Sequence, residues 1–332
     1  MTRDIARTQT MKAWICRNYG GPDVLACEDR PRPMPKANEV LVRICATTVS
    51  SADVRLRTCK FPRGLGLIGR LVFGITRLRQ PILGTDFAGT IETVGRDVTA
   101  FKPGDAVFGF PGAAMRCHAE YRVMPVSKPI ALKPANLSFE EAASLPFGGI
   151  TALHFLRKAN LRAGETVLVI GASGAVGSAM VQLARHMGAT VTGVTSTRNI
   201  GLVGSLGAHS VIDYTREDFT MAAETYDIIA DTVGASSFAR CCPVLNEHGR
   251  YLAISGGLPD LLARPKGTKK SIAGPAAEQQ EDVLHFARLA ESGVLKPVID
   301  RTYAFLQMAQ AHAHVETGHK RGSVVVSVVQ GG

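Results

Sequence analysis

A glycine turn between an apolar strand and a helix restricts the fold of this chain more than any other part of its sequence. The turn follows the apolar run Val167–Ile170 and leads into an amphipathic, helix-like pattern. Gly174 allows a phosphate to approach the backbone closely, and Gly177 allows the helix to pack tightly on the strand. The amides of Ala175 and Val176 would then face the phosphates at the positive end of the helix. The turn therefore predicts a site for the pyrophosphate of a dinucleotide.

The residues after this turn alternate between short apolar strands and helices, as in a parallel, doubly wound sheet. Further strands are expected at residues 190–194, 210–212, 227–231 and 249–255. We predict that this dinucleotide-binding domain spans residues 133–295. Its Pro-, Gly- and Lys-rich segment 259–277 is predicted to be a mobile loop.

The beginning and the end of the chain show a different pattern. Residues 11–132 contain short β-type runs broken by Gly and Pro, which indicates a partly open, mostly antiparallel barrel. The tail contains an apolar strand, 324–329, and is more similar to this first part than to the middle. We therefore expect residues 11–132 and 296–330 to form one domain, and residues 1–10 to be a frayed leader. A length of 332 residues suits two domains.

The residues after the second strand of the doubly wound sheet favour NADP over NAD. An NAD enzyme places an acidic residue there, against the ribose hydroxyls. This chain has Ser196, Thr197 and Arg198 instead, whose hydroxyls and guanidinium suit a 2′-phosphate that a carboxylate would repel. Tyr214 ends the third strand, where it would either pack beside the same phosphate or be an ordinary strand-end tyrosine.

The net charge of +10 raises nucleic acid or an anionic surface as a partner. Most of the excess lies in residues 55–79, which contain seven Lys or Arg residues, no Asp or Glu, and many interspersed aliphatic residues. Three interpretations are open: a flap over the substrate cleft, a contact with a membrane surface, or a solvated charged face with an ordinary core side. The segment has only two aromatic residues, so no stacking pattern supports nucleic acid.

The cysteines and the N-terminus indicate the compartment. There are seven cysteines and no C-x-x-C pair, which favours a reducing cytoplasm over a disulfide framework. The first ten residues, MTRDIARTQT, lack the apolar core of a secretory signal. The longest uncharged stretch, 166–184, is the strand, turn and helix described above, so we expect no transmembrane segment there.

Several phrases spread along the chain carry a resemblance to a known family. They are PILGTDFAG at 81–89, FKPGDAV at 101–107, the segment 140–151, DTVG at 231–234 and GHKRG at 318–322. The chain resembles the zinc-independent quinone oxidoreductase branch of the medium-chain dehydrogenase/reductase superfamily. This resemblance implies a GroES-like catalytic domain split around a Rossmann domain, and a homodimer.

The resemblance also implies roles for single residues in cofactor binding. Thr151 is expected to contact the nicotinamide ribose. Val233 and Gly234 are expected to line the cofactor, and Ser255 and Gly256 to approach the nicotinamide ring.

Other members of the superfamily are zinc alcohol dehydrogenases, which need thiolate or imidazole ligands at defined positions. Their first cysteine would fall at Ser50, their Gly-His-Glu phrase is Gly84–Asp86 here, and their second cysteine falls near Leu145. We therefore expect no metal. Ser50 falls where many quinone reductases carry a pocket asparagine, and Arg55 where some carry an aromatic, so both are candidate substrate-pocket residues. Asp53 and Asp86 are expected to be structural carboxylates, and no catalytic residue is assigned.

Without zinc ligands, the usual Lewis acid for dehydrogenating simple alcohols is missing. The sequence predicts hydride transfer from NADPH to an acceptor already activated by conjugation, a quinone or an α,β-unsaturated ketone or aldehyde. Backbone amides, a hydroxyl or water would stabilise charge on the carbonyl oxygen. The alternative is a regulatory or moonlighting protein, associated with RNA or a membrane, that binds NADPH with little turnover.

Overall fold

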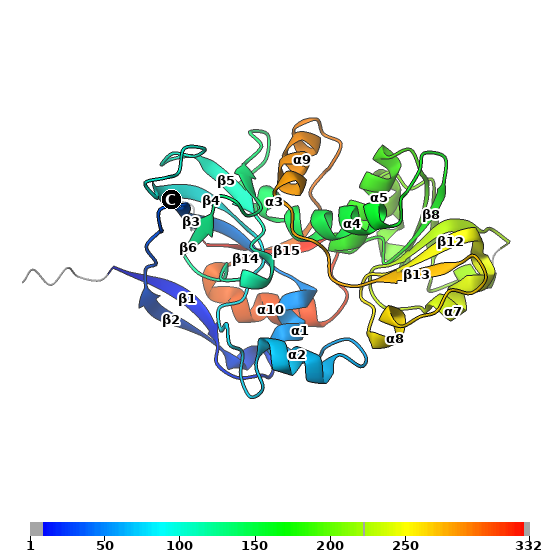
Figure 1. Ribbon diagram of the computed structural model, residues 1–332, viewed down its shortest axis with the longest axis horizontal. Helices are drawn as coiled ribbons and strands as arrows, with labels where there is room; N and C mark the ends of the chain where they lie inside the picture. The colour runs from blue at the N-terminus through cyan, green and yellow to red at the C-terminus, as the bar shows by residue number, and fades with distance from the viewer. Residues whose placement is uncertain (1–8, 222, 329–332) are drawn as a thin grey trace, which may run out of the picture.

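Two main β-sheets organise the chain, and the computed structural model describes residues 9–221 and 223–328 of it (Figure 1). The middle of the chain forms the six-stranded sheet, and the first third joins with the end of the chain in the seven-stranded sheet. The two sheets correspond to the two kinds of sequence pattern, so the predicted fold class is confirmed. Residues 1–8 of the expected leader and 329–330 of the expected tail lie outside the described residues.

The six-stranded sheet is parallel throughout, in the order β10-β9-β8-β11-β12-β13. Its strands are β8 (Thr166–Ile170), β9 (Thr190–Thr195), β10 (Ser210–Asp213), β11 (Tyr226–Asp231), β12 (Leu245–Ala253) and β13 (Lys270–Ala273). Alternate residues of β8 enter different cores. Val167 and Val169 pack in the core that also contains side chains of α4 (Pro146–Lys158), α5 (Ala175–His186) and α9 (Gln280–Glu291). Leu168 and Ile170 pack in the core on the other side, which explains why β8 is apolar almost throughout.

The prediction of a mobile loop at residues 259–277 is wrong. The segment continues a short helix, α8 (Leu258–Leu261), and contains β13, which pairs with β12 and forms an edge of the sheet. The sequence did not predict this strand of only four residues, because Pro, Gly and Lys residues surround it. Its Ile272 is buried against the main core of the domain.

The seven-stranded sheet has the order β14-β15-β3-β4-β5-β7, with β6 also paired to β3. Its strands are β3 (Glu39–Val49), β4 (Phe87–Val94), β5 (Ala106–Gly109), β6 (Tyr121–Pro125), β7 (Ile130–Leu132), β14 (Ile299–Ala304) and β15 (Ser323–Ser327). β15 pairs antiparallel with β3, so a strand from the end of the chain lies beside one from its beginning. A separate pair, β1 (Thr10–Cys16) and β2 (Leu25–Pro31), lies beside this sheet. The exact domain limits stay a prediction.

The remaining helices are short. They are α1 (Ser51–Thr58), α2 (Gly66–Phe73), α3 (Phe139–Ala143), α6 (Ile200–Ser205), α7 (Phe238–Cys241) and α10 (Met308–Glu316). Single 3-10 turns are η1 (Pro22–Val24), η2 (Gly112–Ala114), η3 (Thr197–Asn199), η4 (Phe219–Met221), η5 (Cys242–Val244) and η6 (Phe305–Gln307). In the described part of the chain, no helix is long and apolar enough to cross a membrane.

The basic segment 55–79 contains α2 and the second half of α1. Arg57 does not belong to its charged surface, because its side chain is fully buried and pairs with Glu316. The interpretation as a solvated charged face with an ordinary core side fits only part of the segment, because Leu78 is buried and Phe61 and Phe73 pack against the same core. The aliphatic side chains of α2, among them Leu67 and Leu71, are exposed rather than buried.

Candidate dinucleotide-binding site

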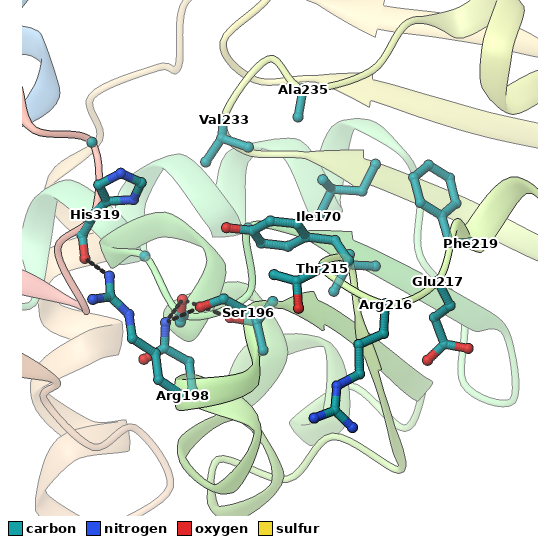
Figure 2. A pocket seen from close by; sticks show the side chains of 18 of the residues that line it. Ile170, Ser196, Arg198, Thr215, Arg216, Glu217, Phe219, Val233, Ala235 and His319 are labelled. Carbon is teal, nitrogen blue, oxygen red and sulfur yellow. Dashed lines mark hydrogen bonds between the residues drawn. The ribbon is translucent and has the colours of Figure 1, made fainter.

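A cavity of about 710 Å³ lies along the carboxyl ends of β8, β9, β10 and β11 (Figure 2). Parallel strands bring the loops that follow them to one edge of a sheet, where nucleotides bind in this kind of fold. A fifth segment, residues 318–320 between α10 and β15, lines the cavity from the end of the chain. The site therefore combines four neighbouring loops with a loop from far along the sequence.

The glycine turn after β8 has the geometry that an anion needs. A Cβ on Gly177 would lie 2.1 Å from the carbonyl oxygen of Gly171, so only glycine lets α5 pack this closely on the turn. Around Gly174, the only described atom near a Cβ position is the Gly171 oxygen, at 3.4 Å. That side of the turn is open, and α5 begins directly behind it with amides that lack partners within the helix. The turn fits a pyrophosphate.

The residues after β9 combine hydroxyls with a cation. Ser196 and Arg198 line the cavity, and the Arg198 Nη2 donates a hydrogen bond to the His319 carbonyl oxygen at 2.7 Å (Figure 2). Thr197 does not line the cavity, because its hydroxyl donates to the Asp213 carboxylate. Hydrogen bonds from the Thr197 and Thr215 hydroxyls hold the pKa of Asp213 below its usual value. The Asp213 carboxylate is thus already hydrogen-bonded to side chains of the protein.

The loop from the end of the chain closes one side of the cavity. The Gly322 amide donates to the Ser173 carbonyl oxygen at 2.7 Å, which ties the loop to the glycine turn. The Lys320 Nζ donates to the Gly322 carbonyl oxygen at 2.6 Å, and burial lowers the pKa of Lys320 to about 8. Lys320 lines the cavity together with Gly174 of the glycine turn.

The turn after β11 is organised by one carboxylate. The Asp231 Oδ1 accepts hydrogen bonds from the amides of Val233, Gly234 and Ala235, at 2.7–3.2 Å. Gly234 has a φ of +77°, which favours glycine. The Ser255 hydroxyl donates to the carbonyl oxygen just before Val233, so the loops after β11 and β12 lie side by side.

The cavity brings together part of the predicted set. Its lining includes five of the predicted residues: Gly174, Ser196, Arg198, Tyr214 and Val233. The other predicted residues do not line it: Thr151, Ala175, Val176, Gly177, Thr197, Gly234, Ser255 and Gly256. Several lining residues were missed by sequence reasoning: Ser173, Asn199, Thr215, Arg216, Arg240, His319 and Lys320. The GHKRG phrase, which contributed to the family resemblance, was the available signal for the last two.

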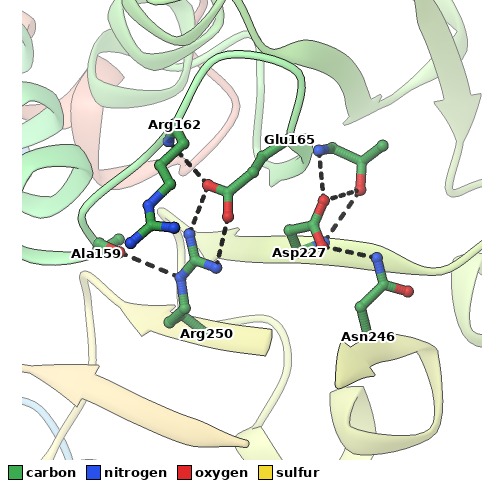
Figure 3. A network of polar contacts seen from close by, with 7 residues as sticks. Ala159, Arg162, Glu165, Asp227, Asn246 and Arg250 are labelled. Carbon is green, nitrogen blue, oxygen red and sulfur yellow. Dashed lines mark hydrogen bonds and ion pairs between the residues drawn. The ribbon is translucent and has the colours of Figure 1, made fainter. Parts of the chain in front are cut away.

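The amino-terminal edge of the same sheet is held by a separate polar network (Figure 3). Arg250 donates two hydrogen bonds to the Glu165 carboxylate, at 2.9 and 2.7 Å. Asp227 accepts from the amide and hydroxyl of Thr166 and from Asn246. These contacts fix the sheet at the edge opposite the cavity.

At the positions where zinc ligands would stand, and directly beside them, the side chains have other partners. Ser50 caps α1, and its amide and hydroxyl both donate to the Asp53 carboxylate. Burial raises the pKa of Asp86 to about 7, although this carboxyl accepts hydrogen bonds from the Thr48 hydroxyl and the Phe147 amide. Within residues 9–221 and 223–328, no three His, Cys, Asp or Glu side chains form a group that could hold a metal ion. These residues do not fit a catalytic zinc.

Of the two candidate substrate-pocket residues, Ser50 is the N-cap of α1 and Arg55 lies in its last turn, and neither lines the cavity. The Ser50 hydroxyl is used in capping, as described above. Arg55 is half-buried, and burial lowers the pKa of its guanidinium. Their contact with a substrate stays a prediction.

The chain forms a parallel sheet with a cavity at its carboxyl edge, and a second sheet that it leaves and re-enters. This combination is typical of a two-domain dehydrogenase or reductase. The comparisons agree with this class. Residues 36–135 match the family model for the alcohol dehydrogenase GroES-like domain, and residues 206–326 match that for zinc-binding dehydrogenase.

The chain is 34% identical to a 2-methylene-furan-3-one reductase of Solanum lycopersicum, over 95% of this chain and 79% of that one. It is 33% identical to a chloroplastic NADPH-dependent alkenal/one oxidoreductase of Arabidopsis thaliana, over 98% and 82%. A solved quinone oxidoreductase from Coxiella burnetii superposes with a TM-score of 0.86 at 30% identity, over 97% of this chain and 100% of that one. The chain belongs to the quinone oxidoreductase-like branch of the medium-chain dehydrogenase/reductase superfamily.

Proposed function

We propose that this protein is an NADPH-dependent reductase of quinones or α,β-unsaturated carbonyl compounds. One observation carries the cofactor assignment. The loop after β9 presents Ser196 and Arg198 to the cavity, where an NAD enzyme has a carboxylate. The relatives named above reduce an alkenal or enone or a quinone according to their names, and one is named NADPH-dependent.

The residues of the cavity suit the parts of the cofactor in turn. The glycine turn and the first amides of α5 would hold the pyrophosphate. Ser196 and Arg198, with Tyr214 beside them, would hold the adenosine 2′-phosphate. Lys320 would compensate the remaining negative charge.

The second group of predicted residues belongs to the other end of the cofactor. Val233 and Gly234 would line the path to the nicotinamide, with Ser255 and Gly256 beside them. Thr151, whose hydroxyl donates to the Phe147 carbonyl oxygen, would contact the nicotinamide ribose through its remaining lone pairs.

The bound cofactor supplies a hydride. The acceptor takes this hydride and a proton from solvent, which gives a hydroquinone or a saturated carbonyl compound. The protein orients the two partners and offers amides or a hydroxyl to the carbonyl oxygen as it gains charge.

We also propose that the enzyme works without zinc. Ser50 and Thr85 stand at two of the ligand positions, where their hydroxyls donate to the carboxylates of Asp53 and Asp86, and the third is occupied by Leu145, a buried apolar residue. Adding a zinc chelator should leave turnover unchanged, whereas a loss that added zinc restores would contradict this proposal.

The experiment that tests the function combines binding and turnover. NADPH is titrated by fluorescence, and the loss of the nicotinamide absorbance band is then followed with a set of quinones and enones. Saturable binding with turnover on at least one acceptor is expected. Tight NADPH binding with no turnover on any acceptor would favour the regulatory alternative instead.

Three further features are proposed. The family resemblance supports a homodimer, which sedimentation would test. The seven cysteines are free in the structure, in keeping with a reducing compartment such as the cytoplasm. We propose the domain limits 11–132 with 296–330 and 133–295, which limited proteolysis would test.

A further inference from the structure

The helix α2 and the turn after it expose a group of aliphatic side chains. Five side chains form it, and their exposed fractions lie between 51% and 73%: Leu67, Ile68, Leu71, Val72 and Ile75. The four on α2 have the i, i+1, i+4, i+5 spacing that places residues on one side of a helix. We call these five residues together the aliphatic face.

The inward side of α2 is already filled, so the helix has no room to turn this face inward. Gly69 is buried, and a Cβ there would lie 2.5 Å from the Phe61 ring. Phe61 and Phe73 stack on each other with ring centroids 5.8 Å apart. The Tyr19 hydroxyl donates to the carbonyl oxygen of Gly74, which ends the helix. These contacts hold the aliphatic face outward.

The surroundings of the aliphatic face are cationic. Five basic side chains of this segment are exposed: Lys60, Arg63, Arg70, Arg77 and Arg79. Among the described residues, none of the five forms an ion pair, and residues 55–79 contain no carboxylate to neutralise them. Seven of the ten excess positive charges of the chain therefore fall in this one segment, and five of them lie on its surface.

A hollow next to the aliphatic face adds a place for an anionic headgroup. It has a volume of about 1040 Å³ and is lined by Ile75, Arg77 and Arg79 from the segment. Arg17 and Arg30 line it from the other side and are both paired with Glu28, which also lines it. The two arginines of the segment have no such partner and remain available to a phosphate.

We propose that this surface docks the protein on an anionic lipid bilayer, with the aliphatic face in the interface and the cations against the headgroups. The charge of the segment complements an anionic surface. Nucleic acid is the weaker partner, because the exposed side chains between the cations are aliphatic. The two aromatic rings of the segment, Phe61 and Phe73, are occupied in stacking on each other.

The location of the surface gives docking a consequence for the reaction. The Leu258 amide donates to the Arg63 carbonyl oxygen at 2.8 Å, so the segment touches the loop that contains Ser255 and Gly256. A bilayer at this surface would lie near the end of the site proposed for the nicotinamide. Acceptors dissolved in the membrane would then reach the enzyme directly. This consequence rests on the proposed function, whereas docking itself does not.

Vesicle flotation tests the docking with the full chain. Binding is expected to vesicles of phosphatidylcholine mixed with phosphatidylglycerol, much weaker binding to phosphatidylcholine alone, and a decrease with added salt. Replacing Arg77→Ala together with Arg79→Ala should weaken the partition coefficient by about fivefold for each cation removed. Leu67→Glu together with Leu71→Glu should abolish flotation.

A matched control is Leu132→Glu, which changes an exposed leucine of β7 outside the segment and should float like the wild type. The proposal fails if the wild type does not float with anionic vesicles, or if the aliphatic double variant floats as well as the wild type. Retention on RNA without vesicle binding, or a change of oligomeric state in the double variant without vesicle binding, would equally overturn it. NADPH oxidation measured on the same samples separates this failure from a failure of the proposed function.

Discussion

Replacing Arg198→Ala should change the choice between NADPH and NADH more than it changes binding in general. In the structure, one nitrogen of the Arg198 guanidinium donates to the His319 carbonyl oxygen, and the exposed side chain keeps further N–H groups for a ligand. A hydrogen bond to a charged group contributes about 1.5–3 kcal/mol. Because the side chain is exposed and screened by water, we take the lower end, about 1.5 kcal/mol or about tenfold in Kd.

The bond to His319 is lost with either cofactor, so its contribution cancels in the ratio of the two dissociation constants. We therefore expect the ratio of the NADH to the NADPH dissociation constant to fall about tenfold, whatever happens to each constant. Fluorescence titration of both cofactors, at low and at high salt, measures this ratio. The preference of the wild type for NADPH should also decrease as salt increases.

The matched control is Arg240→Ala, which removes a cation from the same cavity. Arg240 is paired with Asp218 at 2.6 Å, so its removal should leave the ratio nearly unchanged. An equal weakening of NADPH and NADH in Arg198→Ala would refute the assignment of the 2′-phosphate to this residue. The same fall in the ratio for both variants would show a general effect of charge rather than a specific contact.

Three further predictions concern stability and are measured by denaturant unfolding. Gly177→Ala should destabilise the fold by about 1–3 kcal/mol and abolish NADPH binding, because the added Cβ would lie 2.1 Å from the Gly171 oxygen. The control Gly201→Ala should be tolerated, because no atom lies within 4 Å of the Cβ position there. Burial raises the pKa of Asp86 to about 7, so between about pH 4 and pH 7 the native state keeps a proton that the unfolded state has released. The free energy of unfolding of the wild type should therefore fall across this range by up to ~1.4 kcal/mol per pH unit. Asp86→Asn should lack this pH dependence. Burial alone would raise the pKa of Glu165, but hydrogen bonds from Arg250 hold this pKa below its usual value. The ionised carboxylate should therefore stabilise the fold by about 1 kcal/mol, and this contribution should be lost as the pH falls through the pKa. Glu165→Gln should not show this loss. An unchanged pH profile in either carboxyl variant, or a Gly177→Ala protein as stable as the wild type, would contradict the corresponding argument.

The sequence predicted most of the fold where the signal was local. The apolar run before Gly174 and the glycines after it determine a strand, a turn and a helix within a dozen residues, and the structure has them as expected. The short strand β13 was missed because four residues of mixed character carry no periodicity, and their pairing with β12 depends on a partner elsewhere in the chain. Predictions of this kind succeed where neighbours in sequence are neighbours in space.

In the candidate site, too, the sequence predicted residues with a local signal and missed those that depend on contacts between distant parts of the chain. Arg198 was identified because it follows a strand whose end faces the cofactor in this class of sheet. Thr197, its neighbour, was placed in the site with it, yet its hydroxyl bonds to Asp213, which lies on another strand. Lys320 was not assigned because its loop reaches the cavity through contacts between distant parts of the chain, namely the pairing of β15 with β3 and the hydrogen bond from Gly322 to Ser173.

The buried charge in the basic segment could not be found from composition. Arg57 looks like the other cations of the segment in sequence, but it is enclosed and paired with Glu316 on α10. Conversely, the aliphatic residues of α2 look like core residues in sequence and are exposed. The packing of Gly69 and Phe73 of α2 against Phe61, together with the hydrogen bond from Tyr19, decides which side of the helix faces out.

The most direct test of the reductase function follows the hydride itself. NADPH carrying deuterium at the reactive position of the nicotinamide is mixed with the protein and an α,β-unsaturated ketone that the turnover assay has identified as an acceptor. The account predicts deuterium at the β-carbon of the product and a solvent-derived hydrogen at the α-carbon, with one NADPH consumed for each product formed. NADPH consumption without deuterium in the product would contradict it.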